Sequence, residues 1–183
     1  AFNNCERLTG EIVFPETLRY IGDHAFENSQ LTELTLGDNV QTIGDYAFYD
    51  CKKLTAVHIS SIEAWCKISF GNTYSNPLYT SRGNLYINGE LVKDIVIPEN
   101  VTAIGNNAFC GCSNLTSIAI PEGVTSIGEY AFSCCENLTS INIPESVASI
   151  GRYAFNECQN LTTSITIPEG VTTIESSTFY NCK

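Results

Sequence analysis

Cysteine is the residue type in this chain that most invites a chemical role, because nine cysteines occur among 183 residues. Four of them lie close together in the second half: Cys110, Cys112, Cys134 and Cys135. Clustered thiols could hold zinc, but structural zinc sites use C-x2–4-C pairs, and no histidine lies nearby. We therefore expect no metal site, whereas a surface disulfide between Cys110 and Cys134 remains open.

The two histidines, His24 and His58, are the only imidazole bases. His58 stands between Val57 and Ile59, so its side chain is expected to point outward from a strand. Neither histidine belongs to a recognisable Ser-His-Asp or Cys-His arrangement. The chain is therefore predicted to have no catalytic residues, to use no cofactor and not to be an enzyme.

The charge of the chain excludes several classes of partner. Its net charge of -11 repels nucleic acid phosphates and anionic lipid. No apolar run approaches the roughly 18 residues that a membrane span needs. Five Pro-Glu steps could attract calcium, although one carboxylate per step is more typical of a solvated edge. These glutamates are Glu16, Glu99, Glu122, Glu145 and Glu169.

An internal repeat explains most of these residues. The unit reads L-x-x-I-x-I-P-x-x-V-x-x-I-G-x-x-A-F-x-x-C, and about seven copies of roughly 23 residues span positions 1–183. Its Ala-Phe step recurs at Ala1-Phe2, Ala25-Phe26, Ala47-Phe48, Ala108-Phe109, Ala131-Phe132 and Ala154-Phe155, with Thr178-Phe179 as a variant. We interpret the whole chain as one repeat domain.

The unit predicts a turn of a β-rich α/β solenoid. Ile118 and Ile120 alternate with Ala119, the period of a strand with one buried face, and Pro121 ends that strand. Gly128 permits the next corner, and the following G-x-x-A-F-x-x-C stretch is expected to form a short helical or 3-10 turn on the convex side. A lone unit buries too little to fold, so stacked units must share one core.

The repeat also gives most of the cysteines a structural role. Three residues after each Phe stands Cys5, Cys51, Cys112, Cys135, Cys158 or Cys182, with Ser29 as the one substitute. This spacing predicts a ladder of small buried side chains along the solenoid axis. Adjacent rungs are close enough for disulfides, but parallel side-chain directions and Ser29 favour free thiols.

Residues 60–94 interrupt the repeat. Ser61 is a candidate N-cap for a helical turn with Ile62, Trp65 and Ile68 on one face, and Asn88-Gly89 is typical of a type I′ hairpin. One interpretation makes the segment a binding protrusion with exposed aromatic residues. The other, which we favour, makes it an enlarged variant repeat in which Trp65 and Leu78 fill the core.

The repeat unit closely resembles the BspA-type leucine-rich repeat family of bacterial surface proteins, and the resemblance covers nearly the whole chain. It implies a curved, right-handed leucine-rich-repeat horseshoe with a parallel sheet. It also implies an extracellular or cell-surface location and adhesion to host proteins or neighbouring cells. The family has no catalytic residues to transfer. The chain is further expected to be part of a longer array.

The predicted function is that of a protein-interaction module, with a structural spacer as the alternative. We expect a protein partner and a monomeric chain. The outward sheet positions are small and polar, without Trp, Tyr or Arg, so strong binding is expected at the tyrosine-rich edge or in the 60–94 segment. The candidate binding residues are His58 and Asn142 on the sheet, Trp65, Tyr74 and Tyr79 in the segment, and Tyr46, Tyr130 and Tyr153 at the edge.

Overall fold

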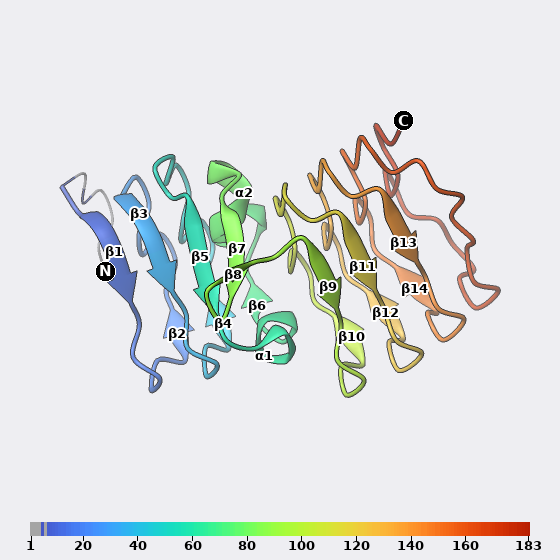
Figure 1. Cartoon of the computed structure of the whole chain (residues 1–183), viewed down its shortest axis with the longest axis horizontal. Helices are drawn as coiled ribbons and strands as arrows, with labels where there is room; N and C mark the ends of the chain where they lie inside the picture. The colour runs from blue at the N-terminus through green and yellow to red at the C-terminus, as the bar shows by residue number, and fades with distance from the viewer. Residues whose placement is uncertain (1–4, 6) are drawn as a thin grey trace.

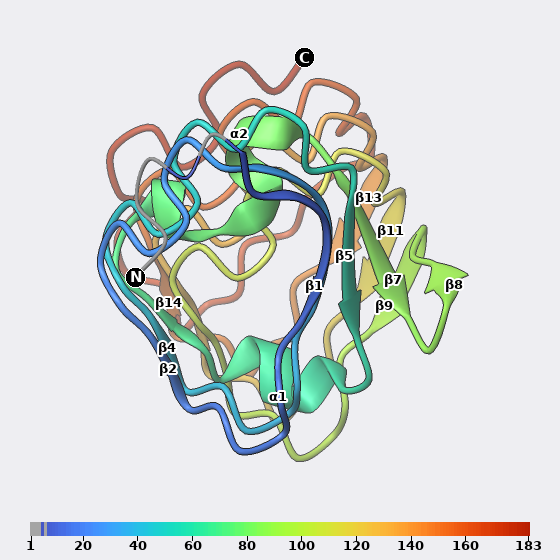
Figure 2. The same ribbon diagram turned by 90° about the vertical axis from the view of Figure 1, so that its left-hand side faces the viewer.

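The computed structural model describes Cys5 and residues 7–183 and confirms a solenoid with parallel sheets. Successive turns of the chain stack side by side along the long axis, with the two termini at opposite ends (Figure 1). A view along that axis shows two walls of strands around a common interior (Figure 2). The first Ala-Phe step, Ala1-Phe2, lies outside the described residues.

Each wall of the solenoid consists of two separate sheets. One wall contains β1 (Thr9–Val13), β3 (Gln30–Thr35), β5 (Ala56–Ile59), β7 (Asn84–Ile87) and β8 (Glu90–Leu91), followed by β9 (Asp94–Val96), β11 (Ser117–Ala119) and β13 (Ser140–Asn142). The other contains β2 (Tyr20–Ile21), β4 (Thr42–Ile43) and β6 (Ser69–Phe70), followed by β10 (Ala103–Ile104), β12 (Ser126–Ile127) and β14 (Ser149–Ile150). All these pairs are parallel except β7 with β8.

The core is a stack of identical side chains contributed by successive repeats. Phe109, Phe132 and Phe155 are fully buried, and their neighbouring rings stack with centroids 5.4 and 5.5 Å apart. The strand isoleucines form a second stack, because Ile118 faces Ile95 on one side and Ile141 on the other. Each repeat therefore covers the apolar face of the next, as the repeat pattern predicts.

The G-x-x-A-F-x-x-C segments form β-turns instead of the expected helical or 3-10 turn. In one repeat the N–H of Ala131 donates to the Gly128 carbonyl, but Tyr130 and Cys134 have φ values of 54° and 61°. These left-handed residues interrupt the uniform right-handed backbone that any helix requires. The helical elements that the structure describes all lie in the enlarged repeat: α1 (Ile62–Cys66), η1 (Thr73–Ser75) and α2 (Pro77–Ser81).

The enlarged repeat contains the helical turn and the hairpin that its sequence predicts, together with η1 and α2, which it did not predict. The Ser61 hydroxyl caps α1 by accepting from the Ala64 N–H at 3.1 Å. Asn88 and Gly89 both have positive φ, 51° and 84°, which is the type I′ hairpin between β7 and β8. Leu78 is fully buried, and the indole of Trp65 packs inside the solenoid, so this segment mainly extends the core.

Both walls are interrupted after the enlarged repeat. β6 is not paired with β10, and β8 is not paired with β9. The neighbours of the repeat glycines show that the stacking differs at this point. A Cβ on Gly128 would lie 2.6 Å from the backbone nitrogen of Asn106, whereas a Cβ on Gly105 would lie 3.0 Å from the carbonyl oxygen of Cys66. The repeat that begins near β9 therefore packs against Cys66 of the enlarged repeat, and not against the residue that follows the glycine of that repeat.

The thiol ladder is present, and its cysteines are free. Four of the thiols, those of Cys51, Cys135, Cys158 and Cys182, donate to the carbonyl of the Phe one repeat earlier; the distance is 3.2 Å for both Cys135 to Phe109 and Cys158 to Phe132. Cys110 and Cys134 are also free but buried, so the surface disulfide that the sequence left open between them does not form. Burial raises the pKa of the Cys135 and Cys158 thiols of the ladder, which keeps them protonated.

Candidate functional site

An outward row of side chains crosses the first wall of the solenoid. The strand register places Val13 beside Thr35, Thr35 beside His58, and His58 beside Tyr86. The antiparallel hairpin then places Leu91 opposite Tyr86, on the same face. We call these five residues the sheet-face row. Successive outward positions align because the side chains of parallel strands in register share a face.

His58 and Tyr86 form the centre of the sheet-face row. Their rings stack with centroids 4.9 Å apart and an interplanar angle of 22°. His58 Nε2 lies 3.3 Å from Glu33 Oε2, which fixes the imidazole at its other side. The structure thus confirms that His58 points outward from β5.

Tyr86 overturns the expectation that the sheet lacks an aromatic anchor. The hairpin segment Leu85-Tyr86-Ile87 alternates, with Leu85 buried in the core, so Tyr86 must point outward. That alternation was the signal in the sequence. It was missed because residues 60–94 interrupt the repeat pattern on which the outward positions were counted.

Apolar side chains extend the sheet-face row toward both ends. Leu91 is 39% exposed, and the hairpin that carries it projects from the wall (Figure 2). Val13 and Val96 are exposed as well, Val96 at 76%. Asn142 is exposed at the equivalent position of β13 and stands beside the small Ala119. The outward surface of this wall is therefore aromatic and apolar at β7 and β8, and small or polar at β11 and β13.

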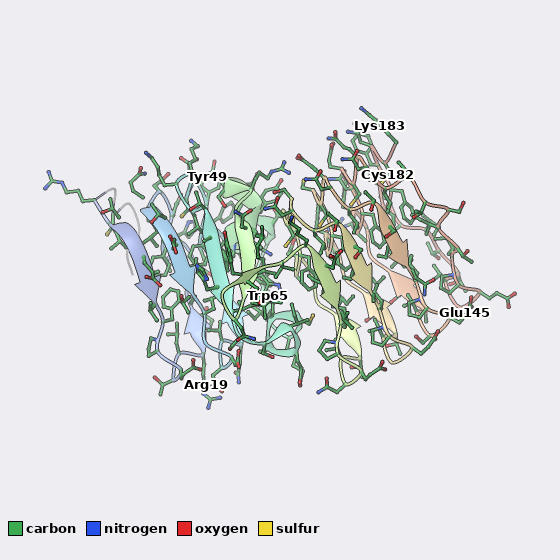
Figure 3. The ribbon with its side chains drawn as sticks, in the orientation of Figure 1. Arg19, Tyr49, Trp65, Glu145, Cys182 and Lys183 are labelled. Carbon is green, nitrogen blue, oxygen red and sulfur yellow. The ribbon has the colours of Figure 1, made fainter. Side chains whose placement is uncertain are left out.

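The tyrosine-rich edge consists of two stacks on the turn side of the solenoid. The first contains His24, Tyr46 and Tyr74, with centroids 5.3 and 5.4 Å apart, and Tyr49 meets Tyr46 and Tyr74 edge-on. Figure 3 shows Tyr49 at the outer edge of the molecule. Tyr79 packs edge-on against Tyr74, and burial raises its pKa to about 12.

The second stack is the pair Tyr130 and Tyr153, with centroids 4.7 Å apart. Asn107 occupies the same repeat position between the two stacks and supplies no ring. The edge is therefore not one continuous aromatic surface. Five of the candidate residues do lie along it: Tyr46, Tyr74, Tyr79, Tyr130 and Tyr153.

Trp65 is wrong as a binding candidate. Its side chain is only 1% exposed, and its Nε1–H donates to the Ala108 carbonyl at 2.7 Å. Figure 3 places it near α1, inward of the outer edge where Tyr49 lies. A buried indole with a satisfied N–H has no surface to offer a partner.

The residues that could do other chemistry are dispersed. His24 Nδ1 lies 2.8 Å from Glu27 Oε2 in an exposed pair. The five Pro-Glu glutamates are all exposed, and Figure 3 shows Glu145 projecting outward. Among the described residues no three His, Cys, Asp or Glu side chains are grouped to hold a metal ion. None of the helices in the described ranges is long and apolar enough to cross a membrane.

Comparison with known proteins gives a consistent result. The model of the BspA type leucine rich repeat region, in six copies, matches residues 1–81 and 82–183. No curated protein was found to match the chain. A leucine-rich repeat protein from Bacteroides ovatus is 28% identical, with a TM-score of 0.58, over 92% of this chain and 39% of its own.

A leucine rich cell surface protein from Faecalibacterium prausnitzii is similar to the same extent. It is 26% identical, with a TM-score of 0.54, over 85% of this chain and 47% of its own. The present chain thus spans less than half the length of either of these two proteins.

Proposed function

Because this chain belongs to the BspA-type leucine-rich repeat family of bacterial surface repeat proteins, we propose that it is a protein-interaction module that acts outside the cell. Its partner is a protein of a host or of a neighbouring cell. The cell-surface description of the Faecalibacterium relative supports this location. The observation that carries the proposal is the stacked pair of His58 and Tyr86 in the sheet-face row.

The centre of the sheet-face row has the aromatic anchor of a binding hot spot. Such sites concentrate tyrosine, tryptophan and arginine, surrounded by contacts that exclude water. Tyr86 and His58 supply a rigid aromatic centre, and Leu91 and Val96 supply exposed apolar area nearby. A partner that covers this area gains roughly 25 cal/mol for each Å² of apolar surface it buries. We assign Asn142, on the same wall, to the polar rim.

The test is biolayer interferometry of the purified protein against extracellular-matrix proteins, mucins and whole bacterial surfaces. Two variants make it specific: Tyr86→Ser removes the anchor, and Tyr20→Ser removes an exposed tyrosine from β2 in the other wall. We expect at least one saturable partner, binding about tenfold more weakly to Tyr86→Ser and equally well to Tyr20→Ser.

The alternative function is a structural spacer that has no ligand of its own. A folded protein that binds nothing on the panel would favour the spacer. Equal binding by Tyr86→Ser and the unchanged chain would remove the sheet-face row as the contact surface and direct attention to the tyrosine-rich edge. Light scattering of the same samples tests the monomeric state.

A further inference from the structure

A cleft of about 360 Å³ lies where the walls are interrupted, between the enlarged repeat and the next one. Its volume is in the range of small-ligand sites. The lining is mostly polar and comes from both sides of the interruption; it includes Asn72, Thr73, Asn106, Asn107, Tyr130 and Arg152. The cleft exists because Gly105 packs against Cys66 and leaves Gly71 and Asn72 without the usual neighbour.

Asn107 lines this cleft and has an unsatisfied polar group. The residue is 5% exposed, and its Oδ1 accepts no hydrogen bond from any described residue. Its backbone is fully engaged, since the carbonyl accepts from Asn76 Nδ2 at 2.7 Å and the N–H donates to Glu129 O at 2.8 Å. A buried acceptor without a donor is costly, and this oxygen is closed to solvent, so a ligand hydroxyl pairs with it only when the Asn107 side chain turns toward the cleft.

Tyr130 provides one open aromatic face in the same cleft. Tyr153 covers one side of its ring in a nearly parallel stack, so the side toward Asn107 faces the cleft. Tyr130 also holds a left-handed backbone with φ of 54°, which suits asparagine and disfavours tyrosine. The ring is therefore retained at a conformational cost.

The charged groups at the mouth of the cleft balance each other. Arg152 Nε donates to Glu129 Oε1 at 2.6 Å, and Asn106 Oδ1 accepts from the Glu129 N–H at 2.8 Å. These contacts leave the terminal guanidinium N–H groups of Arg152 and the amide N–H groups of Asn106 without a hydrogen-bond acceptor among the described residues. The cleft thus offers several donors without net charge.

We propose that this cleft binds a neutral hexose ring of an oligosaccharide. The negative face of Tyr130 attracts the polarised C–H groups on one side of a pyranose, and the amides and Arg152 pair with its hydroxyls. An apolar peptide side chain would need a more apolar pocket than this lining provides. An anionic sugar is disfavoured by Glu129 and by the net charge of -11.

A second cleft has room for the next sugar. It measures about 340 Å³ and shares Phe70 and Asn106 with the first. Ser69 and Ser126 contribute hydroxyls along it. A linear oligosaccharide that follows both clefts makes more contacts than a single hexose and binds more tightly.

The experiment is a screen of the full chain on an array of neutral and acidic oligosaccharides, followed by titration calorimetry of the glycans that bind. Tyr130→Asn removes the aromatic ring, and asparagine tolerates the left-handed backbone at this position. Asn107→Gly removes the side-chain amide, and glycine tolerates the left-handed backbone there as well. His24→Asn is the matched control, because His24 is the terminal ring of the other stack at the equivalent backbone position, with φ of 53°.

We expect neutral oligosaccharides to bind, and Tyr130→Asn and Asn107→Gly each to weaken binding roughly threefold to tenfold. His24→Asn should bind like the unchanged chain. Absence of neutral glycans among the binders, a preference for acidic ones, or binding that is unaffected by Tyr130→Asn would overturn the proposal. Tyr86→Ser separates this site from the protein-binding row, because it should leave glycan binding intact.

Discussion

The thiol of Cys135 donates a hydrogen bond to the carbonyl oxygen of Phe109, 3.2 Å away and one repeat earlier. This contact explains why the repeat uses cysteine there and not another small apolar residue. The thiol fits a fully buried space and still supplies a donor to the neighbouring turn. Ser29, the one exception, keeps this donor chemistry and lies 3.3 Å from Cys51 Sγ.

The first prediction follows from this contact and compares two substitutions of Cys135. Cys135→Ser keeps a donor of similar size, and we expect it to lower the free energy of unfolding by about 1 kcal/mol or less. Cys135→Val loses the donor and adds a methyl group to a fully packed core, so it should cost about 1–3 kcal/mol. Urea unfolding followed by circular dichroism measures both. Equal costs would show that the hydrogen bond contributes nothing.

The second prediction concerns alkaline pH. Burial raises the pKa of the Cys66 thiol from 9.0 to about 12, so the folded chain holds this proton after the unfolded chain has released it. The stabilisation is complete below pH 9 and declines as the pH rises toward 12, by about 1.4 kcal/mol per pH unit for this one group.

The urea midpoint should therefore fall above pH 9 for the unchanged chain. It should fall less steeply for Cys66→Ala, which has no thiol to ionise at this position. The two variants must be compared by their slopes against pH, since Cys66→Ala also loses packing. Parallel slopes would contradict a perturbed thiol at Cys66.

The structure of the repeat could be predicted from the sequence, but the structure at its interruption could not. The ladders of Phe132 and Cys135 could be predicted because each residue recurs at a fixed spacing and meets its own equivalent in the next turn. The cleft beside Asn107 could not be predicted, because it forms only when Gly105 packs against Cys66 and not against Asn72. That displacement is a tertiary consequence of the enlarged repeat, which has no second copy in the chain for comparison.

The third prediction uses two glycines with nearly the same positive φ. Gly111 and Gly89 have φ values of 82° and 84°. A Cβ on Gly89 would meet nothing within 4 Å, whereas one on Gly111 would lie 2.6 Å from the Leu78 carbonyl oxygen. Gly89→Ala should therefore cost only the left-handed strain, about 1–2 kcal/mol.

Gly111→Ala carries the same strain and a backbone collision as well. We expect it to cost clearly more than Gly89→Ala, because the Leu78 carbonyl belongs to α2 and cannot move freely. Thermal unfolding of the two variants under identical conditions makes the comparison. A similar melting temperature for both would mean that α2 yields to the new methyl group.

The last prediction concerns how the two halves of the solenoid are coupled. Because no strand pairs bridge β6 with β10 or β8 with β9, the halves communicate through side chains. Trp65 Nε1 donates to Ala108 O, and Arg82 forms an ion pair with Glu136 at 2.6 Å. The exposed ion pair contributes little, so the principal connections are the buried side chains of Trp65 and of Asn76, whose Nδ2 donates to Asn107 O at 2.7 Å.

Trp65→Ala should cost about 3–5 kcal/mol and should also broaden the unfolding transition. In a repeat protein, stability is the sum of repeat terms and nearest-neighbour interfaces, so a weakened interface allows one half to unfold before the other. Urea unfolding measured by circular dichroism should then show a lower slope or two steps. Glu136→Gln, which removes only the ion pair, serves as the control and should keep one sharp transition. A sharp single transition in Trp65→Ala would mean that the remaining contacts across the interruption are enough to keep the solenoid one cooperative unit.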